Sequence, residues 1–407
     1  MNDPIVLVSS YPPRVSEIAT FTEEARAFIQ KQNPDREVLV ISHVDGRGDG
    51  VFPLIDPARP RWWKPVLNKL DELGPYVVHI QHDTGLYASP DDPSDTADEH
   101  FLDFLEAARH FPLVVEPHTI HSQMHEKEAE FLYRTCRSAD VVIFKCHYQK
   151  WRLDWTFPGM GWRTPTNITI IPQGVRPDRR YGVHEVPEIR RQLGLDRIPN
   201  LSPHLVGLIA CAHGNKRWDI MTGMWEQLRQ EIHNRTGQEW SLLAANAVNA
   251  PRDAATTGPD LATVRELESK GLAHYFEFAA SGDDYYRMMG VCDFIVLPST
   301  DESQSHMLTR IIALNKPFIT SAPLAGLATQ TLESGGGLLF ASANMLREAV
   351  LRLACDEPLR LRLGNELKAY LENVVSWDVV ARQYGQAYAA AHEAKLCGST
   401  VDLSQAY

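Results

Sequence analysis

Short apolar runs alternate along the chain with longer stretches in which apolar residues recur at helical spacing. In the first half, runs that suit buried strands lie at residues 5–8, 38–41, 77–80, 113–115, 141–144 and 168–171. Helical spacing begins near residue 16 and recurs at residues 62–73, 101–108 and 129–136. Strands that alternate with helices indicate a parallel sheet with helices on both faces.

The same alternation starts again after residues 177–203, a charged segment with four prolines. Further strands are predicted at residues 205–211, 240–245, 275–278, 294–297, 318–319 and 338–340. Helices are predicted at residues 187–193, 218–233, 261–270, 284–289, 307–314, 345–355, 359–374 and 377–393. We therefore predict an α/β protein with domains at residues 1–185 and 186–375, followed by a helical segment at 376–407.

Composition narrows the class of protein. The chain has 407 residues, 44% of them hydrophobic and 23% charged, as in a globular protein of two or three domains. A formal net charge of -12 argues against nucleic acid and anionic membrane surfaces as partners. No apolar run has the roughly 18 residues of a transmembrane helix, and no basic segment precedes the first apolar run. Six cysteines without a C-x-x-C motif suggest free thiols, so we expect a cytoplasmic protein.

Residues 293–317 carry the most informative pattern. The buried strand at 294–297 is followed by a polar loop and then by a short apolar stripe at helical spacing, which ends near Asn315 and Pro317. Open α/β sheets bind anionic ligands where a helix starts from the loop after a strand. We therefore expect the backbone N–H groups of residues 305–308 to face a ligand.

This stretch resembles the donor-site segment of the retaining glycosyltransferases of family four, which have the GT-B fold. The residues that match the family pattern are Leu297, Pro298, Ser299, Glu302, Ala313, Lys316 and Pro317. The stretch also departs from the pattern. Ser303, Gln304 and Ser305 replace Gly-Phe-Gly, Arg310 replaces the second glutamate of a Glu-x7-Glu pair, and Asn315 replaces a glycine.

The resemblance continues along nearly the whole chain. Matching segments, in the family's order, are residues 11–13, 78–82, 170–175, 215–216, 356–364 and 376–377. It implies two Rossmann-like domains facing a cleft, with the C-terminal helix crossing back to the first domain. It also implies that the first domain holds an acceptor hydroxyl and the second a nucleotide-diphosphate sugar, with no metal or other cofactor.

By this resemblance, Lys216 contacts the donor phosphates, and Arg217 or Arg310 supplies a second cation. A solvated basic pair is the alternative interpretation of Lys216 and Arg217. A guanidinium cannot accept hydrogen bonds from ribose hydroxyls, but Arg310 could instead grip a phosphate. Three interpretations are open: the donor sits differently, the donor is unusual, or the site is inactive. The other residues expected at the donor are Ser303, Gln304, Ser305, His306 and Met307.

Two residues are implied to be catalytic. Glu302 would lie near the donor sugar, and His118 would bond a sugar hydroxyl or orient the acceptor. Each also has a purely structural interpretation: Glu302 as a loop carboxylate beside Asp301, and His118 as a loop histidine. The departing diphosphate is expected to take the acceptor proton, and the sugar to be transferred with retention.

The acceptor or phosphate loop is expected to include Ser16, Glu17, His82 and Asp83. Glu17 stands where the family has a glycine near the donor phosphate, and a carboxylate there would repel a diphosphate. This departure leaves two interpretations, namely that the loop has moved or that Glu17 faces the acceptor.

Two other classes of protein are open. One is a non-catalytic GT-B protein with a decayed donor site, which would bind a sugar or a protein partner. The other is a metal hydrolase, because the spacing H-x2-H-x3-H puts three imidazoles on one face if that segment is helical. Its candidate ligands are His118, His121, His125, Glu116, Glu126 and Glu128.

Overall fold

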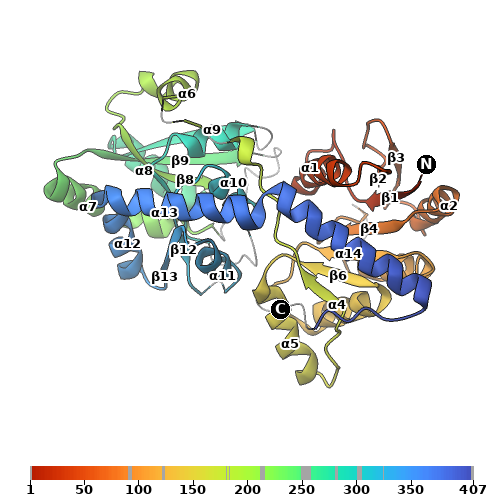
Figure 1. Ribbon diagram of the computed structural model, residues 1–407. Helices are drawn as coiled ribbons and strands as arrows, with labels where there is room; N and C mark the ends of the chain where they lie inside the picture. The colour runs from red at the N-terminus through yellow and green to blue at the C-terminus, as the bar shows by residue number, and fades with distance from the viewer. Residues whose placement is uncertain are drawn as a thin grey trace. The chain divides into compact units, whose positions relative to one another are not determined.

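The structure is a computed structural model. It describes residues 2–89, 94–121, 124–179, 181–182, 184–210, 216–248, 258–279, 283–299, 305–323 and 325–404. The chain divides into two compact units (Figure 1). Unit 1 contains Met1–Gly174 and Trp377–Tyr407, and unit 2 contains Val175–Ser376. The sequence placed the first domain boundary at residue 185, whereas the structure divides the chain after Gly174.

Unit 1 is built on a parallel sheet of seven strands in the order β3-β2-β1-β4-β5-β6-β7. The strands are β1 (Asn2–Val8), β2 (Arg36–His43), β3 (Val51–Ile55), β4 (Val77–His82), β5 (Leu113–Pro117), β6 (Val141–Phe144) and β7 (Ile168–Ile170). The helices are α1 (Glu17–Gln32), α2 (Trp63–Leu73), α3 (Ser94–Ala107), α4 (Glu126–Ser138), α5 (His147–Gly159) and α14 (Trp377–Cys397).

The last helix of the chain, α14, completes unit 1. Its buried residues Trp377, Val380, Tyr384 and Tyr388 share one apolar cluster with strand residues of the first sheet and with Phe21 of α1. In Figure 1 this helix lies along the sheet, over β4 and β6. The predicted return of the C-terminal helix to the first domain is therefore confirmed.

Unit 2 repeats this architecture with a parallel sheet of six strands in the order β10-β9-β8-β11-β12-β13. The strands are β8 (His204–Ala210), β9 (Trp240–Val248), β10 (Ala273–Ala279), β11 (Phe294–Leu297), β12 (Phe318–Ser321) and β13 (Gly337–Phe340). The α-helices are α6 (Val186–Gln192), α7 (Trp218–Thr236), α8 (Gly258–Ser269), α9 (Asp284–Gly290), α10 (His306–Ala313), α11 (Ala325–Ser334), α12 (Ala343–Cys355) and α13 (Glu357–Tyr370). Shorter helical turns lie at Pro177–Arg179, Leu195–Arg197 and Leu371–Val375. The two parallel sheets confirm the predicted α/β class.

Gly174, the last residue of unit 1 before the chain enters unit 2, lies against Trp377. A Cβ atom at residue 174 would overlap the indole ring of Trp377, which is fully buried. Only a glycine lets the backbone approach that ring so closely. The packing explains why a glycine precedes Val175 and why Trp377 begins α14.

Both sheets change strand order at one point. In unit 1 the order reverses between β1 and β4, and in unit 2 between β8 and β11. Open α/β sheets bind ligands in the crevice beyond the carboxyl ends of the strands at such a switch point. The loops after these four strands are therefore where the fold favours a ligand.

Candidate functional site

The predicted site residues lie at or after the carboxyl ends of strands, at or beside the two switch points. In unit 1, Ser16 and Glu17 lie at the start of α1 after β1. His82 is the last residue of β4, and Asp83 follows it. His118 directly follows β5, the neighbour of β4. Topology thus brings the unit 1 candidates to one edge of its sheet, and the same holds for the described candidates of unit 2.

His118 is buried at this edge, with only 2% of its surface exposed. Its ring Nε2 lies within hydrogen-bond distance of the side-chain oxygen of Gln81, and its backbone N–H donates to the carbonyl oxygen of His82 at 2.8 Å. The edge of its ring meets Phe21, with ring centroids 4.8 Å apart. The Gln81 and Phe21 contacts hold the imidazole, and the backbone hydrogen bond holds the chain at residue 118.

A buried polar cluster lies next to His118. Its centre is the carboxylate of Glu116 in β5, which is fully buried. Four side chains contact its two oxygens. Lys145 forms an ion pair with Oε1, and the Tyr384 hydroxyl lies 2.9 Å from the same oxygen. Gln81 Nε2 and His79 Nε2 lie 2.9 and 2.8 Å from Oε2.

The ionisation of this cluster follows from its burial. Burial raises the pKa of Tyr384 well above its usual range, so its hydroxyl keeps its proton and acts as a donor. Burial lowers the pKa of His79 to about 3, so its ring is neutral. The Tyr388 hydroxyl lies 2.7 Å from Nδ1 of that ring, within hydrogen-bond distance. Burial also lowers the pKa of Lys145, an effect that its contact with Glu116 opposes.

The sequence analysis did not identify Gln81, Lys145 or Tyr384 as site residues. A signal was present, because Gln81 and Lys145 are polar residues directly after runs that are mainly apolar. Each lies at the carboxyl end of a strand, where Gln81 is in β4 and Lys145 follows β6. Glu116 was considered only as a metal ligand.

Ser16 has a structural role. It is the N-cap of α1, and its Oγ accepts a hydrogen bond from the Ala19 N–H at 3.0 Å. Glu17 follows as an exposed carboxylate in the first helical turn, where a negative charge complements the helix dipole. Both local roles are explained without a ligand.

His82 and Asp83 differ in environment. The ring of His82 packs against Phe101 and Phe131, and burial lowers its pKa to about 4. It is therefore a neutral histidine in an aromatic cluster. Asp83 is half-buried and accepts a hydrogen bond from the Thr119 hydroxyl at 2.6 Å, which ties the loop after β4 to the loop after β5.

In unit 2, Lys216 and Arg217 lie between the end of β8 and the start of α7. Lys216 is half-buried. Arg217 has a left-handed backbone, and its guanidinium contacts both carboxylate oxygens of Asp219 at 2.9 and 3.0 Å. The two residues therefore differ, because the guanidinium of Arg217 binds the carboxylate of Asp219 at the start of α7.

On the β11 side, Ser305 is the buried N-cap of α10. His306 is the first residue of that helix, and Met307 is buried in the apolar core. The N–H of Leu308 donates to the Ser305 carbonyl oxygen at 3.0 Å, so the expectation that this N–H faces a ligand is wrong. Its bond closes the first turn of the helix instead.

Arg310 lies on α10 with its guanidinium 4.1 Å from the centroid of the Tyr285 ring. Tyr285 belongs to α9 and is buried. The guanidinium therefore makes a cation–π contact with this ring. Of the predicted donor residues, Glu302, Ser303 and Gln304 lie outside the described residues.

The candidate metal ligands do not gather in the part of the chain that the structure describes. Residues 118–121 and 124–125, which the structure describes between the end of β5 at Pro117 and the start of α4 at Glu126, are not in a helix. The spacing of His118, His121 and His125 therefore does not place them on one helical face. His121 instead contacts Glu128 at 3.1 Å.

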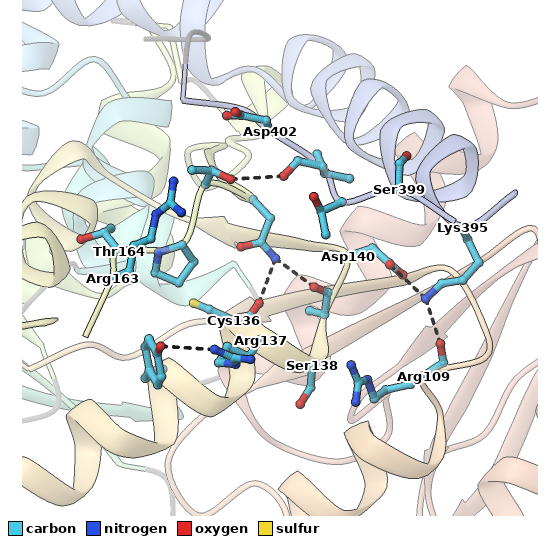
Figure 2. Close-up of a pocket in the computed structure, with 17 residues that line it drawn as sticks. Arg109, Cys136, Arg137, Ser138, Asp140, Arg163, Thr164, Lys395, Ser399 and Asp402 are labelled. Atoms are coloured by element: carbon cyan, nitrogen blue, oxygen red, sulfur yellow. Dashed lines mark hydrogen bonds and ion pairs between the residues drawn. The ribbon is translucent and has the colours of Figure 1, made fainter. Parts of the chain in front are cut away.

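A pocket of about 610 Å³ lies at the opposite edge of the unit 1 sheet (Figure 2). None of the predicted site residues lines it. One of its cations, Lys395, binds the protein itself: it donates to the carbonyl oxygen of Arg109 at 2.8 Å and pairs with Asp140 at 2.9 Å. Asn167 donates to the carbonyl oxygens of Cys136 and Ala139 at the end of α4. Cations and donors are expected where helices end.

No described helix is both long enough and apolar enough to cross a membrane.

Neither a protein-family model nor a curated protein matches the chain in sequence. Solved structures do match it. A sucrose-phosphate synthase from Thermosynechococcus elongatus is 17% identical, with a TM-score of 0.72 over 96% of this chain and 100% of that chain. Anabaena HepE in complex with UDP-glucose is 15% identical, with a TM-score of 0.69 over 95% and 99% of the two chains. A glycosyltransferase from Rickettsia africae is 12% identical, with a TM-score of 0.69 over 96% and 99%.

These similarities cover whole chains and show the fold. The two Rossmann-like units, with parallel sheets of seven and six strands, form the GT-B fold of these glycosyltransferases. The predicted fold class is therefore confirmed.

Proposed function

We propose that the protein is a retaining glycosyltransferase of the family four type, which transfers a sugar from a nucleotide-diphosphate sugar to an acceptor hydroxyl. The observation that carries this proposal is the arrangement at the switch point of unit 2. There Lys216 and the N-terminus of α10 follow the carboxyl ends of two adjacent strands, β8 and β11. A cation and a helix N-terminus both favour an anionic group at that edge.

A diphosphate leaving group gains charge as the bond to the sugar breaks. Groups that are held in place before the reaction stabilise that charge most effectively. Lys216 would be the first such group. Arg310, whose guanidinium stacks on Tyr285, would be the second, and Arg217 is the weaker candidate because Asp219 binds it.

The sugar end of the donor requires groups that bind hydroxyls. In this proposal Glu302 lies near the anomeric carbon, and His118 of unit 1 contacts a sugar hydroxyl or orients the acceptor. In this proposal the departing diphosphate takes the acceptor proton. The sugar is transferred with retention, and no metal takes part.

The first donor to test is UDP-glucose, because Anabaena HepE has been solved with it and has this fold. The purified chain should be incubated with a panel of nucleotide-diphosphate sugars, with hydroxyl acceptors or water, and release of the nucleotide diphosphate measured. Proton NMR of the first product formed would give its anomeric configuration. Release of the nucleotide with retained configuration supports the proposal, and inversion contradicts the retaining mechanism.

Lys216→Ala tests the assignment of the site. It should abolish turnover while the melting temperature stays the same. Lys368→Ala is the matched control, because Lys368 is an exposed lysine of the same unit. Full turnover by Lys216→Ala would contradict the donor site proposed.

A second candidate is a non-catalytic GT-B protein with a decayed donor site. It is favoured by the contacts of two predicted donor residues, since Arg217 binds Asp219 and Met307 lies in the core. A protein of this class would be stabilised by a nucleotide or sugar, yet release no nucleotide with any acceptor.

A further inference from the structure

Glu116 is the centre of a chain of hydrogen bonds that ends at His118. The first link is the Gln81 amide, whose Nε2 lies 2.9 Å from Oε2 of Glu116. A carboxylate only accepts hydrogen bonds, so the amide NH₂ of Gln81 must face it. The opposite orientation would place two oxygens with negative partial charge against each other.

The second link follows from the first. With its NH₂ directed at Glu116, Gln81 presents its carbonyl oxygen to Nε2 of His118. That oxygen can only accept, so Nε2 of His118 carries a hydrogen. In a neutral imidazole the other ring nitrogen, Nδ1, then holds the lone pair.

We propose that Glu116, through Gln81, fixes His118 in the Nε2–H tautomer, so that Nδ1 is the ring nitrogen that can accept a hydrogen bond. Glu116 and Gln81 are positioning residues in this scheme. The assignment of a role to His118 rests on the proposed function, whereas its tautomer does not.

The remaining members of the cluster hold Glu116 in its ionised form. Its Oε1 contacts the Lys145 ammonium and the Tyr384 hydroxyl. Its Oε2 contacts the Gln81 amide and the neutral ring of His79. A carboxylate that accepts several hydrogen bonds strongly favours the charged state. A protonated Glu116 could donate a hydrogen bond to Gln81 and so reverse the orientation of its amide. The donors around Glu116 keep it ionised and thereby preserve the orientation of the Gln81 amide.

Stability alone gives a weak reason for such a cluster. A buried ion pair often adds little to stability compared with apolar residues of similar volume, because both charges lose their hydration. All of Glu116, Lys145 and Tyr384 are almost fully buried, and Gln81 and His118 continue the chain to the sheet edge. A role in directing His118 gives the polar cluster a function that apolar packing would not supply.

The test is a direct measurement of the tautomer in the full-length chain. Protein labelled with ¹⁵N at histidine gives two-bond ¹H–¹⁵N correlations that identify which ring nitrogen is protonated, and His118→Gln assigns the signal. The expected result at neutral pH is a neutral His118 with its hydrogen on Nε2. A hydrogen on Nδ1 in the unmodified protein would overturn the proposal without any variant.

Two variants test the hydrogen-bond chain from Glu116 through Gln81 to His118. Gln81→Met removes the amide at similar volume, and the double variant Glu116→Gln/Lys145→Met releases the amide without leaving a buried charge unpaired. Both should produce a substantial Nδ1–H population. Tyr87→Phe is the matched control, since the Tyr87 hydroxyl donates to the backbone oxygen of Gln81 at 2.8 Å and not to its side chain. It should keep the Nε2–H form.

Turnover provides the second measurement. If the chain releases nucleotide from a sugar donor, Gln81→Met should lower kcat by about tenfold or more and change KM for the donor by less than about threefold. Unchanged tautomers in both variants would overturn the positioning role. An inactive protein with the expected tautomers would contradict the proposed function and leave the hydrogen-bond chain established.

Discussion

The hydroxyl of Tyr384 donates to the carboxylate of Glu116 at 2.9 Å, across 268 positions of the sequence. Glu116 lies in the fifth strand of unit 1, and Tyr384 lies in the last helix of the chain. The bond therefore attaches α14 to the sheet at a buried charge, in addition to the apolar contacts along the same face.

Removing this hydroxyl should weaken unit 1. In Tyr384→Phe the carboxylate loses one donor while the ring keeps its packing, so the free energy of unfolding should fall by about 1–3 kcal/mol. Urea denaturation followed by tryptophan fluorescence would measure it, because Trp377 is buried on α14. An unchanged transition would show that the remaining donors satisfy Glu116.

The ion pair of Lys145 and Glu116 should show strong coupling. Lys145→Met leaves a carboxylate buried without its cation, and Glu116→Gln leaves the cation without its anion, so each should cost about 3–5 kcal/mol. The double variant should cost clearly less than the sum of the two, because neither charge remains. Additive losses in the denaturation cycle would argue that the pair does not interact.

Gly174→Ala should destabilise unit 1, because the new methyl group would overlap the Trp377 ring. Overpacking of this kind costs about 1–3 kcal/mol. Gly385→Ala is a suitable comparison, since Gly385 lies within α14 and a Cβ there would meet no atom within 4 Å. Alanine should stabilise the helix at that position by about 0.5–1 kcal/mol. Equal melting temperatures for the two variants would contradict this packing argument.

Stability should also fall in mild acid. Burial lowers the pKa of His79 to about 3 and that of His82 to about 4, whereas histidine in an unfolded chain titrates near about 6.5. Below that pH the unfolded state binds protons that the folded state does not, so the free energy of unfolding decreases as the pH falls from about 6.5 towards 4. Above about 6.5 both states are neutral at these rings, and this contribution is constant.

The measurement is the urea midpoint at pH 5 and pH 7, which should be lower at pH 5. His82→Phe should reduce the difference, because phenylalanine fits the aromatic cluster and does not titrate. His110→Gln should leave it unchanged, since the His110 side chain is 56% exposed. An identical pH dependence in His82→Phe would mean that other groups cause the loss.

Glu302→Gln tests the proposed sugar site. It should lower turnover by more than about tenfold, an effect of over roughly 1.4 kcal/mol, because the amide cannot balance positive charge at the anomeric carbon. Asp301→Asn changes the adjacent carboxylate and should have little effect. Equal rates for Glu302→Gln and the unmodified enzyme would make Glu302 a structural residue.

The strands could be predicted largely from the sequence because most are short apolar runs between helical stretches. Strand β3 was missed, and Pro53 within its five residues explains why, since proline interrupts an edge strand pattern. Helix α5 was missed because it carries aromatic residues on both faces. Phe157 is buried, whereas Trp151 and Trp155 are 50% and 67% exposed, so no apolar stripe distinguishes it.

The candidate residues that the structure describes do follow strands, as the sequence predicts, but their contacts could not be predicted. Lys145 and Tyr384 are 239 positions apart, and no local pattern links a lysine after a strand to a tyrosine in a distant helix. Likewise, the sequence placed Arg217 beside Lys216, and only the structure shows it turned onto Asp219. Resemblance located the loops, while side-chain direction depends on tertiary packing.

The position of α14 at the end of the chain also affects the order in which the protein is made. A ribosome that has synthesised residues 1–174 has produced all seven strands of the first sheet, but neither Tyr384 nor Tyr388. Unit 2 is synthesised in between, so it can fold while the apolar face that α14 later covers is still exposed. The half of the protein that is translated first is therefore completed last.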